Sequence, residues 1–224
     1  GEAQATFDTP AGFVEARVVG EGPQRYAEFV NVASAPLEIG TRLRLRDGQT
    51  ITADVVYAGN AYLIVDAGQF GLPIAAETLP RLKRLWAEVR EAANGQMRIR
   101  HPLDPERLIE FDLVQFYGPP THREAHARNV VICTGQISRS PCGTGTCARA
   151  AALWGRGELR VGGEFVNEGL AGDIFRVRPI AEVELAGQQA IVPRVRGQAY
   201  VTGMHQFVID PADPFRHGFV SPAA

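Results

Sequence analysis

The chain of 224 residues is long enough for one large domain or two small ones. Its 45% hydrophobic and 21% charged residues are typical of a soluble globular protein and exclude a disordered chain. The formal net charge of −2, with basic residues spread along the chain, argues against a nucleic-acid partner. Three cysteines do not indicate a disulfide framework, and neither a membrane-spanning run nor a signal peptide is present, so we expect a cytoplasmic protein.

The first third of the chain shows the alternation of apolar and polar residues that is typical of β-strands. Residues 5–18 alternate around Pro10-Ala11-Gly12, which predicts a hairpin. Further strands are expected at 25–33, 41–46, 51–56 and 61–66, the last two joined by a turn at 58–60.

The first predicted helix covers residues 76–93. Its apolar side chains recur at helical spacing, and Asn94-Gly95 is expected to end it. The basic cluster of Arg81, Lys83 and Arg84 indicates a solvated face of this helix. Strands are expected next at 111–117 and 129–134, with an exposed loop around Gly118-Pro119-Pro120 between them.

The second predicted helix starts near Cys142 and runs to about Trp154, with Gly155 and Gly157 as stops. The remaining strands are expected at 175–178, 181–185, 191–195 and 198–209, before a tail rich in proline and glycine. Many strands with two main helices favour an α+β fold, with a curved sheet wrapping a helix, over regular βαβ alternation.

The most unusual segment is 139–149, which reads Arg-Ser-Pro-Cys-Gly-Thr-Gly-Thr-Cys-Ala-Arg. Pro141 suits the entry to a helix, and glycines at 143 and 145 remove side chains where the backbone would meet a ligand. The free N–H groups of a first helical turn favour an anion, so a substrate carboxylate would bind well here.

The same position favours the thiolate form of Cys142, which could then act as a general base or acid. Together these features indicate a reaction that moves the proton on the carbon next to a carboxylate. Cys133 and Cys147 are expected to be buried apolar residues instead. His122 and His126 are four residues apart but lie in a charged loop, so we expect a solvated loop and no metal site.

Residues 143–148 also match the G-x-G-x-x-A fingerprint of dinucleotide-binding proteins. That fingerprint should follow a strand directly, whereas residues 138–141 intervene here. The acidic residue expected about 20 positions later would be Glu164, which follows two glycines in a loop-like stretch. We therefore rank a dinucleotide site well below the proton-transfer interpretation.

At the Cys142 motif the chain resembles proline racemases and hydroxyproline 2-epimerases. Four further segments carry the same resemblance: 7–12 (Phe-Asp-Thr-Pro-Ala-Gly), 57–60 (Tyr-Ala-Gly-Asn), 128–131 (Arg-Asn-Val-Val) and 197–215. The resemblance therefore covers nearly the whole chain.

The resemblance implies a lobe like that of diaminopimelate epimerase, a curved mixed sheet wrapped around a central helix. Residues 1–196 would form the second catalytic lobe, and 197–224 a closing strand and tail that return to a first lobe. Each lobe would give one catalytic cysteine, with no metal or pyridoxal phosphate. Cys142 would be one of the pair, with the Gly143 and Thr144 N–H groups binding the substrate carboxylate and Asn60 lining the pocket.

Three departures from the family pattern bear on activity. The other cysteine motif, Met-Cys-Gly-His-Gly, is absent, so the chain is expected to be a fragment or split gene product that needs a first lobe. Ser138 stands where the family usually has an aspartate that contacts the substrate amine. Gln115 ends a segment where many hydroxyproline epimerases carry a histidine.

Three hypotheses follow. The first is a racemase or epimerase that acts on proline, hydroxyproline or a related amino acid. The second is a trans-3-hydroxyproline dehydratase of the same family, if the missing motif has serine in place of cysteine. The third is a non-catalytic lobe that binds small carboxylates. The substrate and the oligomeric state, a homodimer included, are left open.

Overall fold

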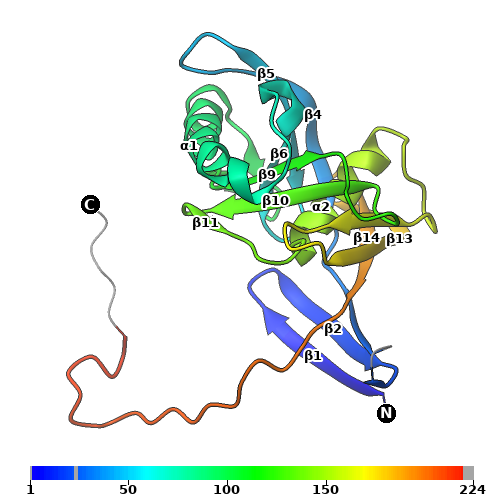
Figure 1. Cartoon of the computed structure of the whole chain (residues 1–224), viewed down its shortest axis with the longest axis vertical. Helices are drawn as coiled ribbons and strands as arrows, with labels where there is room; N and C mark the ends of the chain where they lie inside the picture. Colours follow the sequence, from blue (N-terminus) through cyan, green and yellow to red (C-terminus); the bar gives the residue numbers. More distant parts are fainter. Residues whose placement is uncertain (1, 23–24, 219–224) are drawn as a thin grey trace.

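The computed structural model describes residues 2–22 and 25–218, which form one large mixed β-sheet with two α-helices (Figure 1). The helices are α1 (Leu79–Gln96) and α2 (Gly143–Gly155). The strands are β1 (Ala3–Thr9), β2 (Gly12–Val19), β3 (Tyr26–Val30), β4 (Ala35–Arg44), β5 (Thr50–Tyr57), β6 (Ala61–Asp66), β7 (Arg100–His101), β8 (Asp104–Leu108), β9 (Leu113–Gly118), β10 (Ala127–Cys133), β11 (Gln136–Ile137), β12 (Phe165–Glu168), β13 (Ile174–Leu185) and β14 (Gln188–Gly197).

The strand order in the sheet is β1-β2-β3-β14-β13-β12-β10-β9-β6-β5-β4, with β11 paired to β10 and a separate β7–β8 hairpin. Most neighbours are antiparallel, but β6 pairs with β9 and β10 with β12 in parallel. A parallel pair needs a crossover, and here each crossover contains a helix, α1 in the first and α2 in the second. The mixed sheet with few helices fits the expected α+β class, with two βαβ units at its centre.

The run of strands from β14 to β4 curves until its two ends meet. Ser34, just before β4, forms a β-bridge with Ile191 of β14, with N–O distances of 2.8 and 2.9 Å in the two hydrogen bonds. Helix α2 contacts β4 and β5 at one end of this run and β13 and β14 at the other. Residues 145–152 of α2 are all buried, because their mostly small side chains allow strands to approach from several sides.

Helix α1 packs with only one face. Leu82, Leu85, Val89 and Ala93 are buried in a core that also contains side chains of β4, β5, β6 and β9. The basic residues at 81, 83 and 84 are exposed, as expected from the sequence. Neither α-helix of the described chain combines the length and apolar character that a membrane span requires.

The first helix lies three residues later than predicted. Residues 76–78 form a 3-10 turn, and α1 continues through Asn94 and Gly95 to Gln96. Two side-chain interactions explain the late end. Asn94 exchanges two hydrogen bonds with the Phe111 backbone, at 2.8 and 2.9 Å, and Gln96 exchanges two with the Arg44 backbone. These partners are remote in sequence, so local patterns do not reveal them.

Several strands also differ from prediction. The hairpin around Pro10-Ala11-Gly12 is confirmed as β1 and β2. The strand expected at 41–46 starts earlier, at Ala35. The two strands expected at 175–178 and 181–185 are one strand, β13, with an irregularity between Pro179 and Ala181. The short β7–β8 hairpin was not predicted.

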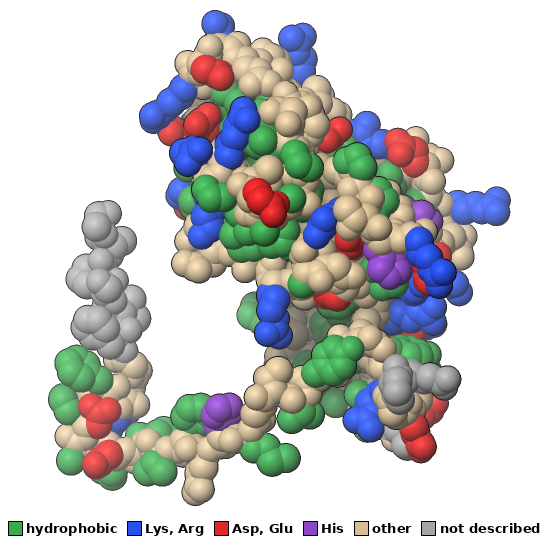
Figure 2. Space-filling view, in the orientation of Figure 1, with side chains coloured by type: hydrophobic (Ala, Val, Ile, Leu, Met, Phe, Trp, Pro, Cys, Tyr) green, Lys and Arg blue, Asp and Glu red, His purple; other side chains and the backbone are tan. Residues whose placement is uncertain are grey.

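The prediction of a strand at 198–209 is wrong. Residues 198–209 contain no strand, and the chain runs away from the sheet as an extended tail (Figure 1). Figure 2 shows hydrophobic side chains along this tail, and the most exposed include Tyr200, Met204 and Phe207. An extended segment becomes a strand only where a neighbour offers backbone partners, and none of the described strands does so here. Residues 219–224 of the predicted tail lie outside the described residues.

Candidate active site

Cys142 is the N-cap of α2. Its Sγ accepts a hydrogen bond from the Gly145 N–H at 3.4 Å, and its carbonyl accepts from Thr146 N at 2.8 Å. Its backbone has φ of 65° and ψ of 115°, in a region that residues with a side chain rarely adopt. The thiol therefore stands at the start of the helix on a backbone that the surroundings must hold in place.

Hydrogen bonds to the carbonyl group of Pro141, directly before Cys142, hold this backbone in place. This carbonyl accepts hydrogen bonds from Asn129 Nδ2 at 3.0 Å, Thr146 Oγ1 at 3.3 Å and Asn167 Nδ2 at 3.4 Å. Asn129 lies on β10 and Asn167 on β12, the two parallel strands that α2 connects. Both asparagines are buried, so these bonds are shielded from water.

Sequence reasoning missed this role of the two asparagines. In the sequence, Asn129 lies within a predicted strand, and Asn167 lies outside the predicted site. The available signal is a single amide side chain in each of two strands, since a buried amide must find a partner.

The glycines of the motif serve close packing. A Cβ at Gly143 would lie 3.0 Å from the Phe29 ring, and a Cβ at Gly145 would lie 3.1 Å from Cys142 Sγ. The sequence interpretation assigned this space to a ligand, whereas protein atoms already occupy it. The first-turn N–H groups of Gly143 and Thr144 remain without a hydrogen-bond partner among the described residues. Such donors at a helix N-terminus attract an anion.

Tyr62, on β6, reaches the motif from the facing strand. Its hydroxyl lies 2.5 Å from Thr144 Oγ1 and 3.6 Å from Cys142 Sγ. The side chain is 1% exposed. Burial, and then the charge of neighbouring Cys142, raise the pKa of Tyr62 above its ordinary value, so the hydroxyl keeps its proton near neutral pH. In the sequence Tyr62 was simply part of a predicted strand.

The other two predicted site residues lie at the edges of this arrangement. The Ser138 hydroxyl donates to the Ser140 carbonyl at 3.1 Å, so it supports the loop before Cys142. Asn60 is exposed in the turn between β5 and β6, where its carbonyl accepts from Ala58 N at 2.9 Å. Cys142, Gly143 and Thr144 thus lie together at the start of α2, and among the described residues the Asn60 side chain has no hydrogen bond to them.

The remaining cysteines differ from each other. Cys147 is fully buried as expected, and burial raises the pKa of its thiol well above the ordinary value. The expectation for Cys133 is wrong, because this residue ends β10 and is only half-buried. Its thiol donates to Asp112 Oδ2 at 3.2 Å; burial, followed by that bond, raises its pKa. Within residues 2–22 and 25–218, no three His, Cys, Asp or Glu side chains gather as metal ligands would.

The dinucleotide interpretation gains no support from the structure. The loop 138–141 separates β11 from α2, so the glycines do not follow a strand directly. Glu164, the acidic residue that would bind a ribose, instead forms ion pairs with Arg176 at 2.9 Å and with Arg178 and Arg196 at longer distances.

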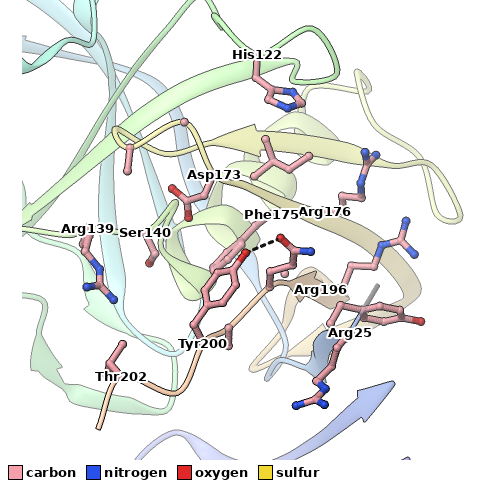
Figure 3. Close-up of a pocket in the computed structure, with 17 residues that line it drawn as sticks. Arg25, His122, Arg139, Ser140, Asp173, Phe175, Arg176, Arg196, Tyr200 and Thr202 are labelled. Atoms are coloured by element: carbon pink, nitrogen blue, oxygen red, sulfur yellow. Dashed lines mark hydrogen bonds between the residues drawn. The ribbon is translucent and has the colours of Figure 1, made fainter. Parts of the chain in front are cut away.

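A cavity of about 920 Å³ opens beside the loop that leads into α2 (Figure 3). Arg139 and Ser140 line it from the motif side, and Tyr200 and Thr202 line it from the tail. Its charged lining residues are Asp173 and the basic side chains Arg25, His122, Arg139, Arg176 and Arg196. Cys142 is not among the lining residues, so this cavity adjoins the thiol site and does not contain it.

The sequence of this chain is similar to those of known enzymes. The family model described as "Proline racemase" matches residues 1–220. The chain is 38% identical over 216 residues to a proline racemase of Clostridioides difficile, covering 96% of this chain and 64% of that protein. It is 34% identical over 220 residues to a 3-hydroxyproline 2-epimerase of Burkholderia multivorans, covering 98% of this chain and 66% of that protein.

A similar solved structure is a hydroxyproline epimerase from Agrobacterium vitis with bound trans-4-OH-L-proline. It superimposes with a TM-score of 0.84 at 28% sequence identity, over 98% of this chain and 63% of that one. The chain thus spans just under two thirds of the length of the C. difficile racemase and of this structure. The match over residues 1–220 and the similarity to both enzymes show that the chain belongs to the proline racemase family.

Proposed function

We propose that this chain is the Cys142-bearing part of an amino-acid racemase or epimerase in which the thiol transfers the Cα proton. The observation that carries the proposal is the N-terminus of α2, where the Cys142 thiol stands next to the N–H groups of Gly143 and Thr144, which have no hydrogen-bond partner in the described part of the chain. Few reactions need a proton carrier beside an anion site, and proton exchange next to a carboxylate is one of them.

In the proposed mechanism the substrate carboxylate binds the N–H groups of Gly143 and Thr144. The Cys142 thiolate takes the α-proton: the C–H bond breaks, an S–H bond forms, and the electron pair moves toward the carboxylate. The helix N-terminus stabilises the negative charge that develops there. A second proton carrier then protonates the opposite face of the α-carbon and is left deprotonated, which inverts the centre. The reverse reaction exchanges the two roles.

The second carrier comes, in this proposal, from a part of the enzyme outside these 224 residues. Cys147 is fully buried and the Cys133 thiol is hydrogen-bonded to Asp112, so neither is free to face Cys142 across a substrate. The chain spans only 64% of the length of the C. difficile proline racemase. We assign residues 1–196 to the second catalytic lobe, with its sheet curved around α2, and 197–224 to the segment that joins the first lobe.

The proposed substrates are proline, hydroxyproline or a related amino acid, because relatives are named for proline and hydroxyproline. Ser138 and Asn60 are proposed to line the substrate pocket. The hydroxyl of Ser138 is neutral and directed to the Ser140 carbonyl, so it offers a substrate ammonium no charge. We therefore expect a substrate preference that differs from enzymes with an acidic side chain at that position.

The test measures deuterium incorporation at Cα in heavy water with a panel of cyclic amino acids. It compares this chain alone with the chain plus a first-lobe polypeptide taken from the C. difficile relative, or with the full product of its gene. We expect exchange with inversion only when both parts are present, and its loss in Cys142→Ala. Absence of exchange with every amino acid in the complete protein would contradict the proposal.

Product analysis in the same experiment separates the alternatives. Loss of water from trans-3-hydroxyproline would identify a dehydratase. Saturable binding of small carboxylates that persists after Cys142 is alkylated, without any turnover, would identify a binding lobe.

A further inference from the structure

The hydroxyl of Tyr62 has a contact that its burial alone does not require. A buried tyrosine hydroxyl needs one partner, and Thr144 Oγ1 at 2.5 Å supplies it. Yet the same hydroxyl also lies 3.6 Å from Cys142 Sγ, nearer than Thr144 Oγ1, which is 3.9 Å from the sulfur. The Tyr62 hydroxyl, the Thr144 hydroxyl and the Cys142 thiol thus form a triangle of three polar groups from β6 and the start of α2.

The number of hydrogens in the triangle limits which hydrogen bonds can form at the same time. Each hydroxyl carries one hydrogen, and a thiolate can only accept. If Thr144 donates to Tyr62 across the short contact, the single hydrogen of Tyr62 is left for Cys142 Sγ. If the short bond runs the other way, only the Thr144 hydrogen remains, and its route to the sulfur is longer. The geometry therefore favours a chain of donors from Thr144 through Tyr62 to the sulfur.

We infer that Tyr62 is a catalytic residue that stabilises the Cys142 thiolate by hydrogen bonding, and that Thr144 orients it. The sulfur would then accept from the Gly145 N–H at 3.4 Å on one side and from Tyr62 on the other. The inference rests on the proposed role of Cys142 as proton carrier. The Tyr62 proton is available as a donor because burial and the neighbouring sulfur oppose its ionisation.

Three titratable groups among the described residues interact electrostatically with Cys142, and they come from three elements. Tyr62 approaches from β6, Cys147 lies one turn along α2, and Cys133 lies at the end of β10. Phe29 of β3, which packs at Gly143, is apolar. Of these groups, only Tyr62 lies within hydrogen-bonding distance of the Cys142 sulfur. A pH-dependent measurement on Cys142 can therefore isolate its contribution.

The test is the rate of alkylation of Cys142 by iodoacetamide as a function of pH, in the full chain. Fragmentation mass spectrometry distinguishes Cys142 from the other two cysteines. Tyr62→Phe keeps the buried ring and removes only the hydroxyl. A hydrogen bond to a charged group is strong enough that we expect the midpoint of the pH profile to rise by about one unit, with a rate about tenfold lower at pH values below the midpoint.

Two further variants complete the design. Tyr57→Phe is the matched control, since Tyr57 is equally buried on the neighbouring strand and packs edge-on against His101. It should leave the midpoint unchanged. Thr144→Val should raise the midpoint by less than Tyr62→Phe does, and Thr144→Ser, which keeps the hydroxyl, should restore it.

Two results would overturn the inference. One is an unchanged midpoint in Tyr62→Phe; the other is a lower midpoint, which would mean that the hydroxyl favours the neutral thiol. If circular dichroism shows that Tyr62→Phe does not fold, equal midpoints for Thr144→Val and Thr144→Ser overturn it instead. Alkylation needs no substrate, so failure of the racemase proposal in the exchange assay leaves this result readable.

Discussion

The two helices of this fold connect parallel strands in the same way but are built for different purposes. Helix α1 buries large side chains such as Leu82 and Val89 on one face and exposes basic residues on the other. Helix α2 buries eight consecutive residues, most of them small, and exposes little beyond its ends. The buried side chains of α1 thus enlarge the hydrophobic core on one side of the sheet. The packing of α2 leaves only the two ends of this helix accessible, and Cys142 stands at the N-terminal end.

The difference shows how a fold can separate stability from chemistry. Among the described residues, the hydrogen bonds and ion pairs of the α1 side chains go to partners outside the motif, so we expect changes in α1 to affect folding alone. Helix α2 is enclosed by strands from both ends of the curved sheet, so changes in its packing reach the site. The following predictions test this contrast, from the largest expected effect to the smallest.

Leu82→Ala should cause the largest loss of stability. Leu82 is fully buried, and its truncation removes apolar contacts and leaves a cavity, for a cost of about 2–5 kcal/mol in unfolding free energy. Urea denaturation measures the loss, and Lys83→Ala on the exposed face is the control, expected within about 0.5 kcal/mol of the parent chain. The pH profile of Cys142 alkylation should stay the same; a shift would show that the two helices are coupled.

Ala150→Leu tests the close packing of small side chains in α2. Ala150 is fully buried in α2, so a larger side chain must displace strands or the helix itself, at about 1–3 kcal/mol. Ala87→Leu, the same change on the exposed face of α1, should be nearly neutral. We expect Ala150→Leu also to change the alkylation rate of Cys142. Equal stability losses for the two variants would refute the contrast.

Asn129→Ala removes one of three donors to the Pro141 carbonyl. Because two donors remain, the stability loss should be that of a single hydrogen bond, about 0.5–1.5 kcal/mol. The matched control is Asn94→Ala, which removes the hydrogen bonds to Phe111 at the end of α1. Both variants should lower the urea midpoint, but only Asn129→Ala should alter the alkylation rate of Cys142.

The last prediction concerns acid. Burial alone would raise the pKa of Glu168, but the N–H groups of His122 and Thr121, the Thr121 hydroxyl and Arg128 outweigh it and lower the pKa below its ordinary value of 4.5. A lowered carboxyl pKa contributes stability above the unfolded-state value, and that contribution is lost as the pH falls through the folded-state value. Hydrogen exchange in acid should therefore increase first around β12 and the 119–126 loop, before α1.

Glu168→Gln provides the control for acid sensitivity. It cannot titrate, so exchange around β12 should no longer depend on pH in this range, and the parent chain and the variant should converge in strong acid. An α1 that loses protection at the same pH as β12 would contradict the separation of the two units.

The parts of the fold that could be predicted depend on local pattern. The β1–β2 hairpin, the exposed basic face of α1 and the start of α2 at Cys142 all follow from residues close together in the sequence. The strand expected at 198–209 failed because its alternation says nothing about whether a neighbouring strand is present. The end of α1 failed because Gln96 binds the Arg44 backbone, 52 residues away.

The residues of the candidate site also divide into those that the local sequence predicts and those that it does not. Cys142, Gly143 and Thr144 are adjacent, so the motif alone predicts them as site residues. Their supporting groups could not be found this way. Tyr62, Asn129 and Asn167 come from three different strands, and only the strand order of the sheet brings them to the start of one helix.

The positive φ of Cys142 has a practical consequence for work on this protein. A residue with a side chain in such a sparsely populated conformation costs roughly 1–3 kcal/mol, whereas glycine adopts it freely. Replacing the thiol by alanine would remove the proposed proton carrier and keep the strain. Cys142→Gly would remove both, and it should withstand more urea than Cys142→Ala. Glycine is therefore the better inert substitute for trapping an unreacted ligand in a crystal. Any side chain at position 142, the thiol included, keeps the backbone in a strained conformation, and glycine relieves that strain.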